Sequence, residues 1–399
     1  MISVKKALSI IKSDARKSSS TETVKLECAL GRITADNIYA KTNNPPFNMS
    51  AMDGYAVSNK SKNNMYELVD EVFAGQPSEK KLLKNQAIRV FTGSKLPQGT
   101  KTVLLQENIK KINQNFIFNK SKKFTVGQYI RVKGLDFRLN TKIISKQKEI
   151  NSRDLALLFS ANVKRIKVYK KPTVVLIASG DELIISDKNR NKGSVYASSL
   201  FMLDALIGIS GATCVSKEII KDKKYLIMSA LKKASLSDII ITTGGVSVGK
   251  KDLIRSSLKD LGFREKFWKI DMKPGKPMLY GILNNKPVFS LPGNPVSSYV
   301  CFLIFILPYI YKKLNINKKL IIKTAYLENK IFPSNERNSY SRGVYHISKD
   351  KFYVKTVSNQ DSSLLNTLSE ANCLVYIPKG SNSIAIGKEI EILILPELH

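Results

Sequence analysis

Hydrophobic positions along the chain follow helical spacing in some stretches and strand spacing in others. Residues 1–38 carry apolar side chains at the three-to-four-residue spacing of a helix. In 39–137, short β-branched and aromatic runs are separated by Gly, Pro and Asn, which is typical of a small all-β unit. A helical stretch follows at 152–159 between short strands. We predict a β-rich insert domain at 39–137, enclosed by a mixed helical linker domain formed by 1–38 with 138–170.

From residue 171 onward, continuous apolar runs alternate with helical segments. The expected order is strand 173–177, helix 199–209, strand 213–219, helix 225–234, strand 238–243 and helix 252–261. Such alternation is typical of an open, mostly parallel α/β sheet with right-handed crossovers. We therefore predict an α/β domain at 171–317. Ligands of such sheets bind outside the carboxyl ends of the strands.

The pattern returns to strand spacing in the last part of the chain. Turn residues separate five short apolar runs, which predict a C-terminal β-barrel domain at 318–399. The longest apolar run, 299–311, is short for a membrane span and contains Pro308, so it predicts a buried core helix. The predicted fold class is thus α/β multidomain. Because the first residues suggest an amphipathic helix rather than a signal peptide, we expect a soluble cytoplasmic protein.

Composition complicates this picture through charge. The 399 residues include 65 Lys and Arg against 32 Asp and Glu, a formal net charge of +33. A basic excess often marks nucleic-acid or membrane binding. Here only 12 of the cations are Arg, and the cations are scattered without the blocks of like charge that form a binding tail. We interpret the charge as diffuse and expect neither nucleic acid nor a membrane as partner.

Cysteine and histidine restrict the possible metal chemistry. The four Cys lie far apart without a CxxC pair, which excludes a zinc ribbon and disfavours a disulfide framework. The two histidines, His346 and His399, are too few for a His-rich metal site. Any metal should therefore be a hard cation held by carboxylates, or be part of an oxyanion held by cations.

Two turn segments carry residue types that hold anions. Gly244 and Gly245, with Ser247 close behind, follow a predicted strand, where backbone amides can approach a phosphate without side-chain bulk. A tight strand-to-helix turn explains the glycines equally well. Lys273 and Lys276 flank a Pro-Gly turn that suits an oxyanion or phosphate, with a solvated surface turn as the alternative.

Carboxylates and prolines also gather at predicted strand ends. Asp181, Glu182 and Asp252 should converge on one crevice, where they could coordinate Mg²⁺ that bridges phosphates. Asp252 could instead be only a helix N-cap. Pro292 and Pro295 make a stiff loop before the next helix, and a helix-entry turn accounts for much of that pattern.

Together these segments resemble one family. In order along the chain, the motifs are Pro-x-Phe-x-x-Ser-Ala-Met-Asp-Gly-Tyr-Ala, Ser-Gly-Asp-Glu-Leu, Thr-Thr-Gly-Gly-Val-Ser-Val-Gly-x-x-Asp, Lys-Pro-Gly-Lys-Pro and Leu-Pro-Gly-Asn-Pro-Val-Ser. Weaker matches occur around Thr92, Asp136, Arg342 and Ser362. The chain is similar over nearly its whole length to the MoeA family, the molybdopterin molybdotransferases.

The resemblance implies a four-domain homodimer whose α/β domain binds molybdopterin, with the active site in a crevice between domains of the two subunits. The implied reaction takes adenylylated molybdopterin and molybdate as substrates, inserts molybdenum and releases AMP. Mg²⁺ is the implied cofactor. A molybdopterin adenylyltransferase would supply the substrate, and molybdoenzymes or their chaperones would receive the product.

The resemblance also assigns roles to matching positions. The catalytic set would be Asp53, Thr92, Asp136, Glu182, Asp222 and Asp252, with Glu182 and Asp252 on the metal. The substrate-binding set would be Gly244, Gly245, Ser247, Lys269, Lys273, Lys276, Pro292, Pro295, Arg342 and Ser362. Within it, molybdate or other anionic groups would be held by Lys269, Lys273, Arg342 and Ser362. The chain departs from the family pattern at Ala197-Ser198-Ser199, at Leu135 and at Lys223.

Other functions stay open at this point. A molybdopterin adenylyltransferase resembles residues 173–312, but such enzymes lack a β insert and a C-terminal β unit like those predicted here. A homologue that inserts tungstate is a second possibility. A non-catalytic scaffold of the gephyrin type would have a long linker and a fused adenylyltransferase domain, and a nucleic-acid binder would need a localised basic face.

Overall fold

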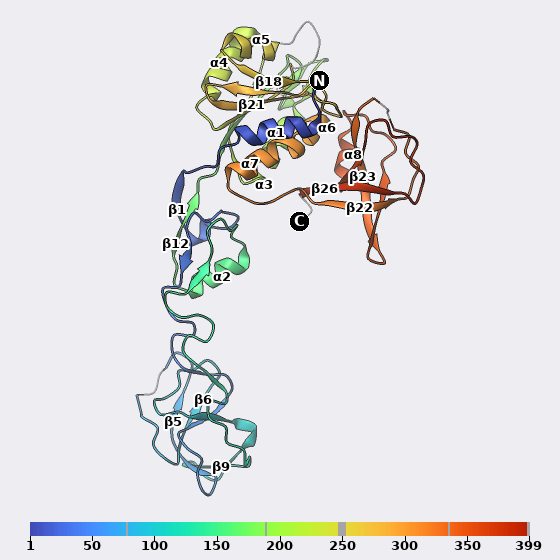
Figure 1. Cartoon of the computed structure of the whole chain (residues 1–399). Helices are drawn as coiled ribbons and strands as arrows, with labels where there is room; N and C mark the ends of the chain where they lie inside the picture. The colour runs from blue at the N-terminus through green and yellow to red at the C-terminus, as the bar shows by residue number, and fades with distance from the viewer. Residues whose placement is uncertain (77–78, 188–189, 246–252, 334–335, 397–399) are drawn as a thin grey trace. The chain divides into compact units, whose positions relative to one another are not determined.

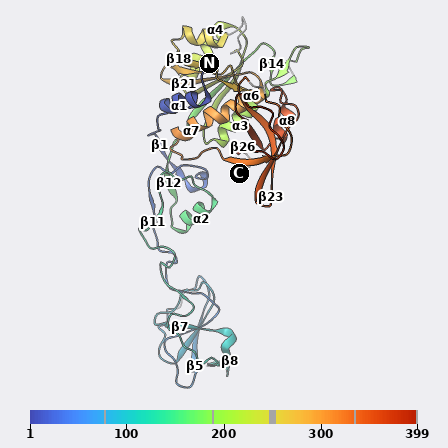
Figure 2. The same cartoon turned by 45° about the vertical axis from the view of Figure 1, so that its right-hand side comes forward.

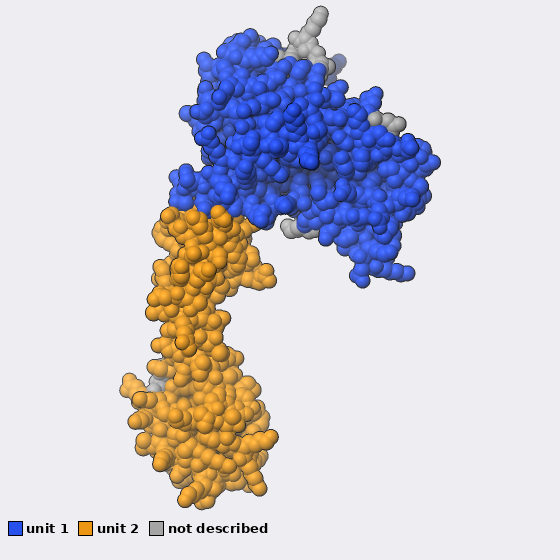
Figure 3. Space-filling view, in the orientation of Figure 1, with its two compact units in different colours: residues 1–21, 169–399 blue, residues 22–168 orange. Residues whose placement is uncertain are grey.

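The computed structural model describes residues 1–399 apart from 77–78, 188–189, 246–252, 334–335 and 397–399. The chain divides into two compact units, coloured separately in Figure 3. Unit 1 comprises Met1–Thr21 and Tyr169–His399, and unit 2 comprises Glu22–Val168. Since each unit has hydrophobic clusters of its own, each is described by itself.

The α/β part of unit 1 is built on a sheet for which six strands are described, in the order β16-β13-β17-β21-β20-β18. The first four strands run parallel, and the last two pairings are antiparallel. The predicted open, mostly parallel sheet is therefore confirmed. The strands are β13 (Thr173–Ser179), β16 (Thr213–Ile220), β17 (Ile239–Thr243), β18 (Arg264–Trp268), β20 (Leu279–Leu283) and β21 (Lys286–Leu291).

Helices cover both faces of this sheet (Figure 1). Leu176 and Ile241 face a core shared with α1, α3, α6 and α7, whereas Ile177 and Ile240 face α4 and α5. This division follows because successive strand side chains point to opposite faces. The helices are α1 (Val4–Asp14), α3 (Ser198–Ile209), α4 (Lys224–Ala234), α5 (Leu253–Asp260), α6 (Pro295–Cys301) and α7 (Leu307–Lys313).

A π-helical segment, η4 (Phe302–Ile306), joins α6 and α7 into one continuous helix. This helix, Pro295–Lys313, is long and apolar enough to cross a membrane, but 78% of its most apolar stretch is buried inside the protein. It lies in the larger core of unit 1, so the predicted core helix is confirmed. Pro308 has no amide N–H to donate, and the wider turns of η4 lie directly before it.

Helix α1 departs from the predicted domain division. It begins after Ser3, whose hydroxyl oxygen accepts a hydrogen bond from the Lys6 amide. Its residue Ile11 is fully buried in the larger core of unit 1. In both views α1 lies beside α7, which it contacts (Figures 1 and 2). The start of the predicted 1–38 segment thus packs with the α/β part, because the apolar face of α1 finds its partners there.

The C-terminal part of unit 1 is a barrel. Its strands pair in the order β23-β24-β22-β26-β25, and β25 pairs again with β23 to close the barrel, which confirms the predicted architecture. The short strand β19 (Met272–Lys273) of the α/β part pairs in parallel with β23. The remaining elements are β22 (Ile322–Leu327), β23 (Asn338–Ser348), β24 (Lys351–Thr356), α8 (Leu365–Glu370), β25 (Cys373–Ile377), β26 (Glu389–Ile394), and the pair β14 (Leu183–Ile184) and β15 (Val195–Tyr196).

Unit 2 consists of a small mixed part and a β-rich part. In the mixed part, a capping box between Asn151 and Asp154 begins helix α2. Leu26, Phe137 and Leu158 share one core, so segments from both sides of the insert fold together. Its elements are β1 (Thr21–Lys25), η1 (Leu26–Cys28), β2 (Ile38–Tyr39), β11 (Lys142–Ile144), α2 (Ser152–Ser160) and β12 (Arg165–Tyr169).

The β-rich part is a sheet with the described order β7-β4-β6-β5-β9-β8. Two hydrophobic clusters pack on its opposite faces, with Ala56 and Ile88 in one and Val57 and Ala87 in the other. Its elements are β3 (Met49–Ser50), β4 (Gly54–Val57), β5 (Met65–Val72), β6 (Gln86–Val90), β7 (Thr102–Leu105), η2 (Gln106–Asn108), β8 (Ile109–Lys111), β9 (Phe116–Asn119) and β10 (Ile130–Arg131).

Replacing Ile11 with Ala should destabilise unit 1 by about 2–5 kcal/mol, because a fully buried side chain is lost from its core. The control Lys5→Ala, on the exposed side of α1, should change the free energy of unfolding by less than about 0.5 kcal/mol. Urea unfolding followed by the fluorescence of Trp268, which is the single Trp of the chain and lies in unit 1, measures both. An unchanged transition in Ile11→Ala would show that α1 is no part of this core.

Candidate active site

Four adjacent parallel strands bring the predicted α/β residues of unit 1 to one edge of the sheet. Asp222 follows β16, Glu182 follows β13, Gly244 follows β17 and Pro292 follows β21. Since these strands are parallel neighbours, their carboxyl ends lie at the same edge. This part of the predicted site is therefore assembled by the sheet itself.

Hydrogen bonds link the loops after β13 and β16. The Asp222 carboxylate accepts a short hydrogen bond from the Ser179 hydroxyl. The Asp222 amide donates to the carboxylate of Asp181 at 3.1 Å. Gly244 packs against the end of β13. Its φ is +83°, and a Cβ at this position would lie 2.4 Å from the Ser179 carbonyl oxygen. Glycine is thus required at 244 by close backbone packing, whatever ligand the loop holds.

The Pro-Gly-Asn-Pro loop after β21 is held from three sides. The Pro292 carbonyl oxygen accepts hydrogen bonds from Thr243 at 3.1 Å and from Ser298 at 2.6 Å. The Ser199 hydroxyl donates to the Gly293 carbonyl at 3.2 Å. Ser199, where the chain departs from the family pattern, therefore supports the loop through its main chain. Pro295 is the first residue of α6, as the helix-entry reading predicted.

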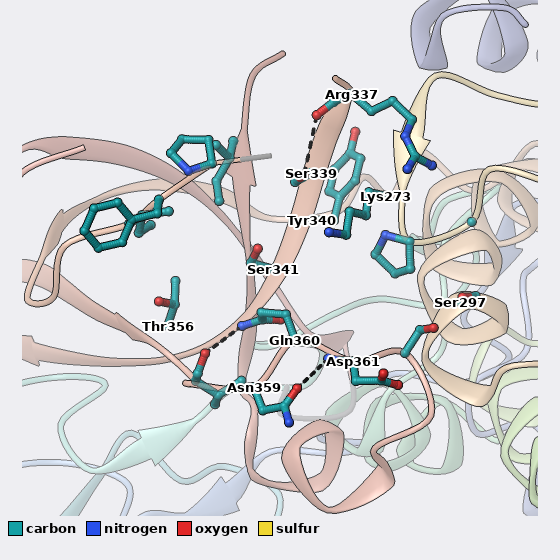
Figure 4. Close-up of a pocket in the computed structure, with 18 of the residues that line it drawn as sticks. Lys273, Ser297, Arg337, Ser339, Tyr340, Ser341, Thr356, Asn359, Gln360 and Asp361 are labelled. Atoms are coloured by element: carbon teal, nitrogen blue, oxygen red, sulfur yellow. Dashed lines mark hydrogen bonds between the residues drawn. The ribbon is translucent and has the colours of Figure 1, made fainter. Parts of the chain in front are cut away.

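A pocket of about 990 Å³ opens between this loop and the barrel (Figure 4). The predicted residues Lys273, Lys276, Pro292 and Ser362 line it. Asn294 connects the Pro-Gly-Asn-Pro loop to the barrel side of the pocket, because its side-chain amide donates to the Ser362 hydroxyl oxygen at 2.7 Å. Further lining residues from the barrel are Asn329, Lys330, Arg337, Ser339, Ser341, Thr356, Gln360 and Asp361.

Cations dominate the charge of the described pocket lining. The lining contains four cationic side chains and one carboxylate, Asp361. The cations are Lys273, Lys276, Lys330 and Arg337. Hydrogen bonds from the Ser363 amide and hydroxyl lower the pKa of Asp361 below its usual value, so that carboxylate stays ionised at neutral pH. The local excess of positive charge suits ligands that carry several negative charges.

In unit 2, Asp53 and Thr92 lie together. One carboxylate oxygen of Asp53 accepts hydrogen bonds from both the amide and the hydroxyl of Thr92, each at 2.8 Å. These bonds, the amide first, lower the pKa of Asp53 below its usual value of 3.8. Gly54 is required beside it, because a Cβ would lie 2.0 Å from the Leu104 carbonyl oxygen. The arrangement holds an ionised carboxylate in one orientation.

Asp136 and Lys269 have other surroundings. The Asp136 carboxylate accepts a hydrogen bond from the Asn44 side chain at 3.1 Å in unit 2. The Lys269 ammonium lies 3.9 Å from the centre of the Trp268 ring in unit 1, and Lys269 does not line the described pocket. The structure therefore pairs Lys269 with an aromatic ring, and its predicted contact with an anion stays a prediction.

Two predicted positions, Ser247 and Asp252, lie outside the described residues. Within the ranges that the structure describes, no group of three or more Asp, Glu, His or Cys side chains is placed to hold a metal ion. Asp181 and Asp222 are neighbours at the sheet edge, and Glu182 follows Asp181 in the chain. The described residues therefore offer few carboxylates, a donor set that fits a cation only if the substrate supplies further oxygens.

Comparisons with known proteins match the whole architecture. Family models match three consecutive segments: the MoeA N-terminal region (domains I and II) at 2–162, a probable molybdopterin binding domain at 175–312 and the MoeA C-terminal region (domain IV) at 324–395. The molybdopterin molybdenumtransferase of Nostoc sp. (strain PCC 7120) is 31% identical over 392 residues, which cover 94% of this chain and 89% of that protein. The chain belongs to the MoeA family.

Further relatives agree with this assignment. The molybdopterin molybdenumtransferase of Haemophilus influenzae is 30% identical over 93% of both chains. The crystal structure of a MoeA protein from Pyrococcus horikosii has a TM-score of 0.83 at 26% identity and covers 99% of both chains. The family predicted from the motifs is confirmed, and so is the transferase class, since both curated relatives are named molybdenumtransferases.

One predicted role in this MoeA-family chain needs correction. Arg342 was expected to hold an anion, but its side chain is buried, with 1% of its surface exposed, and it does not line the pocket. Its N–H groups donate to Gln360, Thr367 and the main-chain carbonyls of 359, 361 and 364. The sequence motif therefore identified a residue that organises the loop around Ser362 rather than one that lines the described pocket.

Sequence reasoning missed Asn294 and Arg337 in the pocket of this MoeA-family protein. Asn294 lies in the segment between Pro292 and Pro295 that was interpreted as a helix-entry turn, yet its side chain makes no capping hydrogen bond and reaches Ser362 instead. Arg337 stands in the polar segment 337–341, and all of its residues except Asn338 line the pocket. The only available signal was the position of this segment directly before the Ser-Arg-Gly match.

Replacing Thr92 with Val should raise the pKa of Asp53 toward 3.8 without restoring it fully, because the amide donor remains. A pKa lowered by folding stabilises the protein above the unfolded value of 3.8, and this stabilisation is lost as the pH falls through the folded value. Thr92→Ser keeps both donors and is the control. Carboxyl ¹³C NMR titration measures the pKa of Asp53 in both variants. An Asp53 pKa unchanged in Thr92→Val would exclude the hydroxyl hydrogen bond as a cause of the lowered pKa.

Proposed function

We propose that this MoeA-family protein is a molybdopterin molybdenumtransferase. It inserts molybdenum from molybdate into adenylylated molybdopterin and releases AMP. The observation that carries the proposal is the cationic pocket between the Pro-Gly-Asn-Pro loop and the barrel, in a chain whose relatives of about 30% identity over most of its length bear that name. The domain matched at 175–312, a probable molybdopterin binding domain, supplies one wall of this pocket.

The pocket chemistry supports anionic substrates. Molybdate is a dianion, and the link between the pterin and the nucleotide is a phosphoanhydride, so both need positive partners. Lys273 and Lys276 provide such charges on a turn stiffened by Pro274 and Pro277. Since no His lines the described pocket, the residues there act by positioning and by electrostatic stabilisation rather than by imidazole proton transfer.

The proposal includes a requirement for Mg²⁺. Mg²⁺ usually keeps several waters and is bound through one or two carboxylates together with substrate phosphates. Glu182 and Asp222, at the carboxyl ends of neighbouring strands, are the described carboxylates suited to this role. A bound Mg²⁺ supplies polarisation of phosphoryl oxygens. Around it, Ser179 holds the Asp222 carboxylate in place through its hydroxyl.

The resemblance also supports a cytoplasmic homodimer that takes its substrate from a molybdopterin adenylyltransferase and passes its product to molybdoenzymes or their chaperones. Light scattering on the purified chain tests the dimer. The scattered Lys residues behind the net charge of +33 would help to draw the two anionic substrates toward the protein.

The purified protein, given adenylylated molybdopterin, molybdate and Mg²⁺, should release AMP and form molybdenum cofactor. Chromatography of the nucleotide and reconstitution of a cofactor-free molybdoenzyme measure the two products. AMP release at the same rate without molybdate, and with no cofactor formed, would contradict the proposed function.

Asp53→Ala should abolish turnover, because it removes the carboxylate that Thr92 orients in the β-rich part of unit 2. The melting temperature should fall only modestly, since Asp53 is half-buried and the variant loses the two hydrogen bonds with Thr92. Glu107→Ala, which removes an exposed carboxylate of the same unit, is the control and should keep full turnover. Full turnover in Asp53→Ala would exclude Asp53 from the reaction.

A further inference from the structure

The donor inventory of Arg342 shows that its guanidinium is fully occupied. A guanidinium has five N–H donors. Here Nε donates to the Gln360 side chain, Nη1 donates to the Leu364 carbonyl and the Thr367 hydroxyl, and Nη2 donates to two further carbonyls of the same loop. No donor of Arg342 remains for a ligand.

The position of Arg342 in β23 agrees with these hydrogen bonds. Arg337, Ser339, Tyr340 and Ser341 line the pocket, whereas Arg342 does not. The hydrogen bonds of Arg342 direct its side chain toward the loop 359–364 and helix α8. Its charge is buried under the loop that presents Ser362 rather than exposed in the pocket.

Arg342 shapes that loop through the peptide groups it binds. In a trans peptide the carbonyl and the next N–H point in opposite directions. Since the carbonyls of Asn359 and Asp361 point at the guanidinium, the amides of Gln360 and Ser362 point away from it. Ser362 lines the pocket, and Asn294 donates to its hydroxyl oxygen, which leaves the hydroxyl proton free to donate to a ligand.

Arg337 has the opposite character. It lies directly before β23, lines the pocket and is half-buried. Among the described residues its guanidinium makes no hydrogen bond, ion pair or ring contact. Lys273 pairs in register with Ser339, two positions further on, so both cations lie at the same end of β23 (Figure 4). The pocket therefore has an arginine with free donors beside a lysine.

We propose that Arg337 is the arginine that contacts the anionic substrate, through bidentate hydrogen bonds to a tetrahedral oxyanion group, and that Arg342 is a positioning residue acting through Ser362. The inference rests on the proposed function for the identity of the anion, which is either molybdate or the phosphoryl group of the nucleotide. A guanidinium with a planar pair of free donors matches both. Arg337 thereby adds a substrate-binding residue that the motifs do not contain.

Direct binding of molybdate and of AMP to the full-length protein, measured separately by calorimetry, tests the role of Arg337. Arg337→Ala should weaken the binding of at least one probe by about tenfold or more, with a melting temperature close to that of the wild type. Arg337→Lys keeps the positive charge but lacks the planar pair of N–H donors, so this variant should bind the probes with intermediate affinity. Arg264→Ala, which removes an exposed charge on β18 outside the pocket, should bind both probes normally.

A double-mutant cycle tests the role of Arg342. Arg342→Lys cannot reach five acceptors, so it should lower the melting temperature and weaken anion binding together. If Arg342 acts through Ser362, the loss caused by Ser362→Ala should shrink in the Arg342→Lys background, whereas the losses from Arg337→Ala and Ser362→Ala should add. A merely structural role would leave Ser362→Ala equally harmful in both backgrounds.

The outcomes separate this proposal from the proposed function. A loss of molybdate binding alone in Arg337→Ala assigns Arg337 to molybdate, and a loss of AMP binding alone assigns it to the phosphoryl group. Binding of both probes within twofold of the wild type, or no binding of either probe by the wild type, overturns the proposal. Normal anion binding that depends on Arg337, without molybdenum transfer in the reconstitution assay, would reject the proposed function and leave this inference standing.

Discussion

The parallel register of β16, β13, β17 and β21 is the constraint on which the α/β side of the pocket depends. It brings segments as distant in sequence as Asp181 and Pro292 to neighbouring points on one sheet edge. The cores on both faces hold this register, because a slip by one residue would turn Leu176 out of one core and Ile177 out of the other. The close approach of Gly244 to Ser179 is possible only in that register.

The buried guanidinium of Arg342 imposes a second constraint, on the barrel side. Removing a charge from water costs free energy unless hydrogen bonds replace the lost hydration. Here the replacement comes from a side-chain amide, a hydroxyl and three carbonyls of one loop segment. The loop must therefore keep its conformation to stabilise the charge. The result is an ordered Ser362 in the pocket lining, whose carbonyl also accepts a hydrogen bond from the Val296 amide of α6.

Much of the local structure could be predicted from the chain alone. Strand β13 and helices α3 and α4 follow the expected segments within two residues at each end, because their apolar spacing and flanking turn residues act locally. Lys273, Lys276, Pro292 and Ser362 were placed in the site by their motifs and line the pocket. Arg342 was placed there too, but a motif marks that a residue matters without telling whether it faces a ligand or supports the residue that does.

The sequence by itself determined the order of the elements, the open parallel sheet, the barrel and the family, because periodicity and motif order are properties of short segments. Only the tertiary structure decided which core receives α1, which partner Asn294 finds and which of two arginines five residues apart has free donors. The physical reason is that these outcomes depend on contacts between segments distant in the chain. The hydrogen-bond donors of a side chain become occupied where such contacts form, and the local sequence pattern does not show which donors these are.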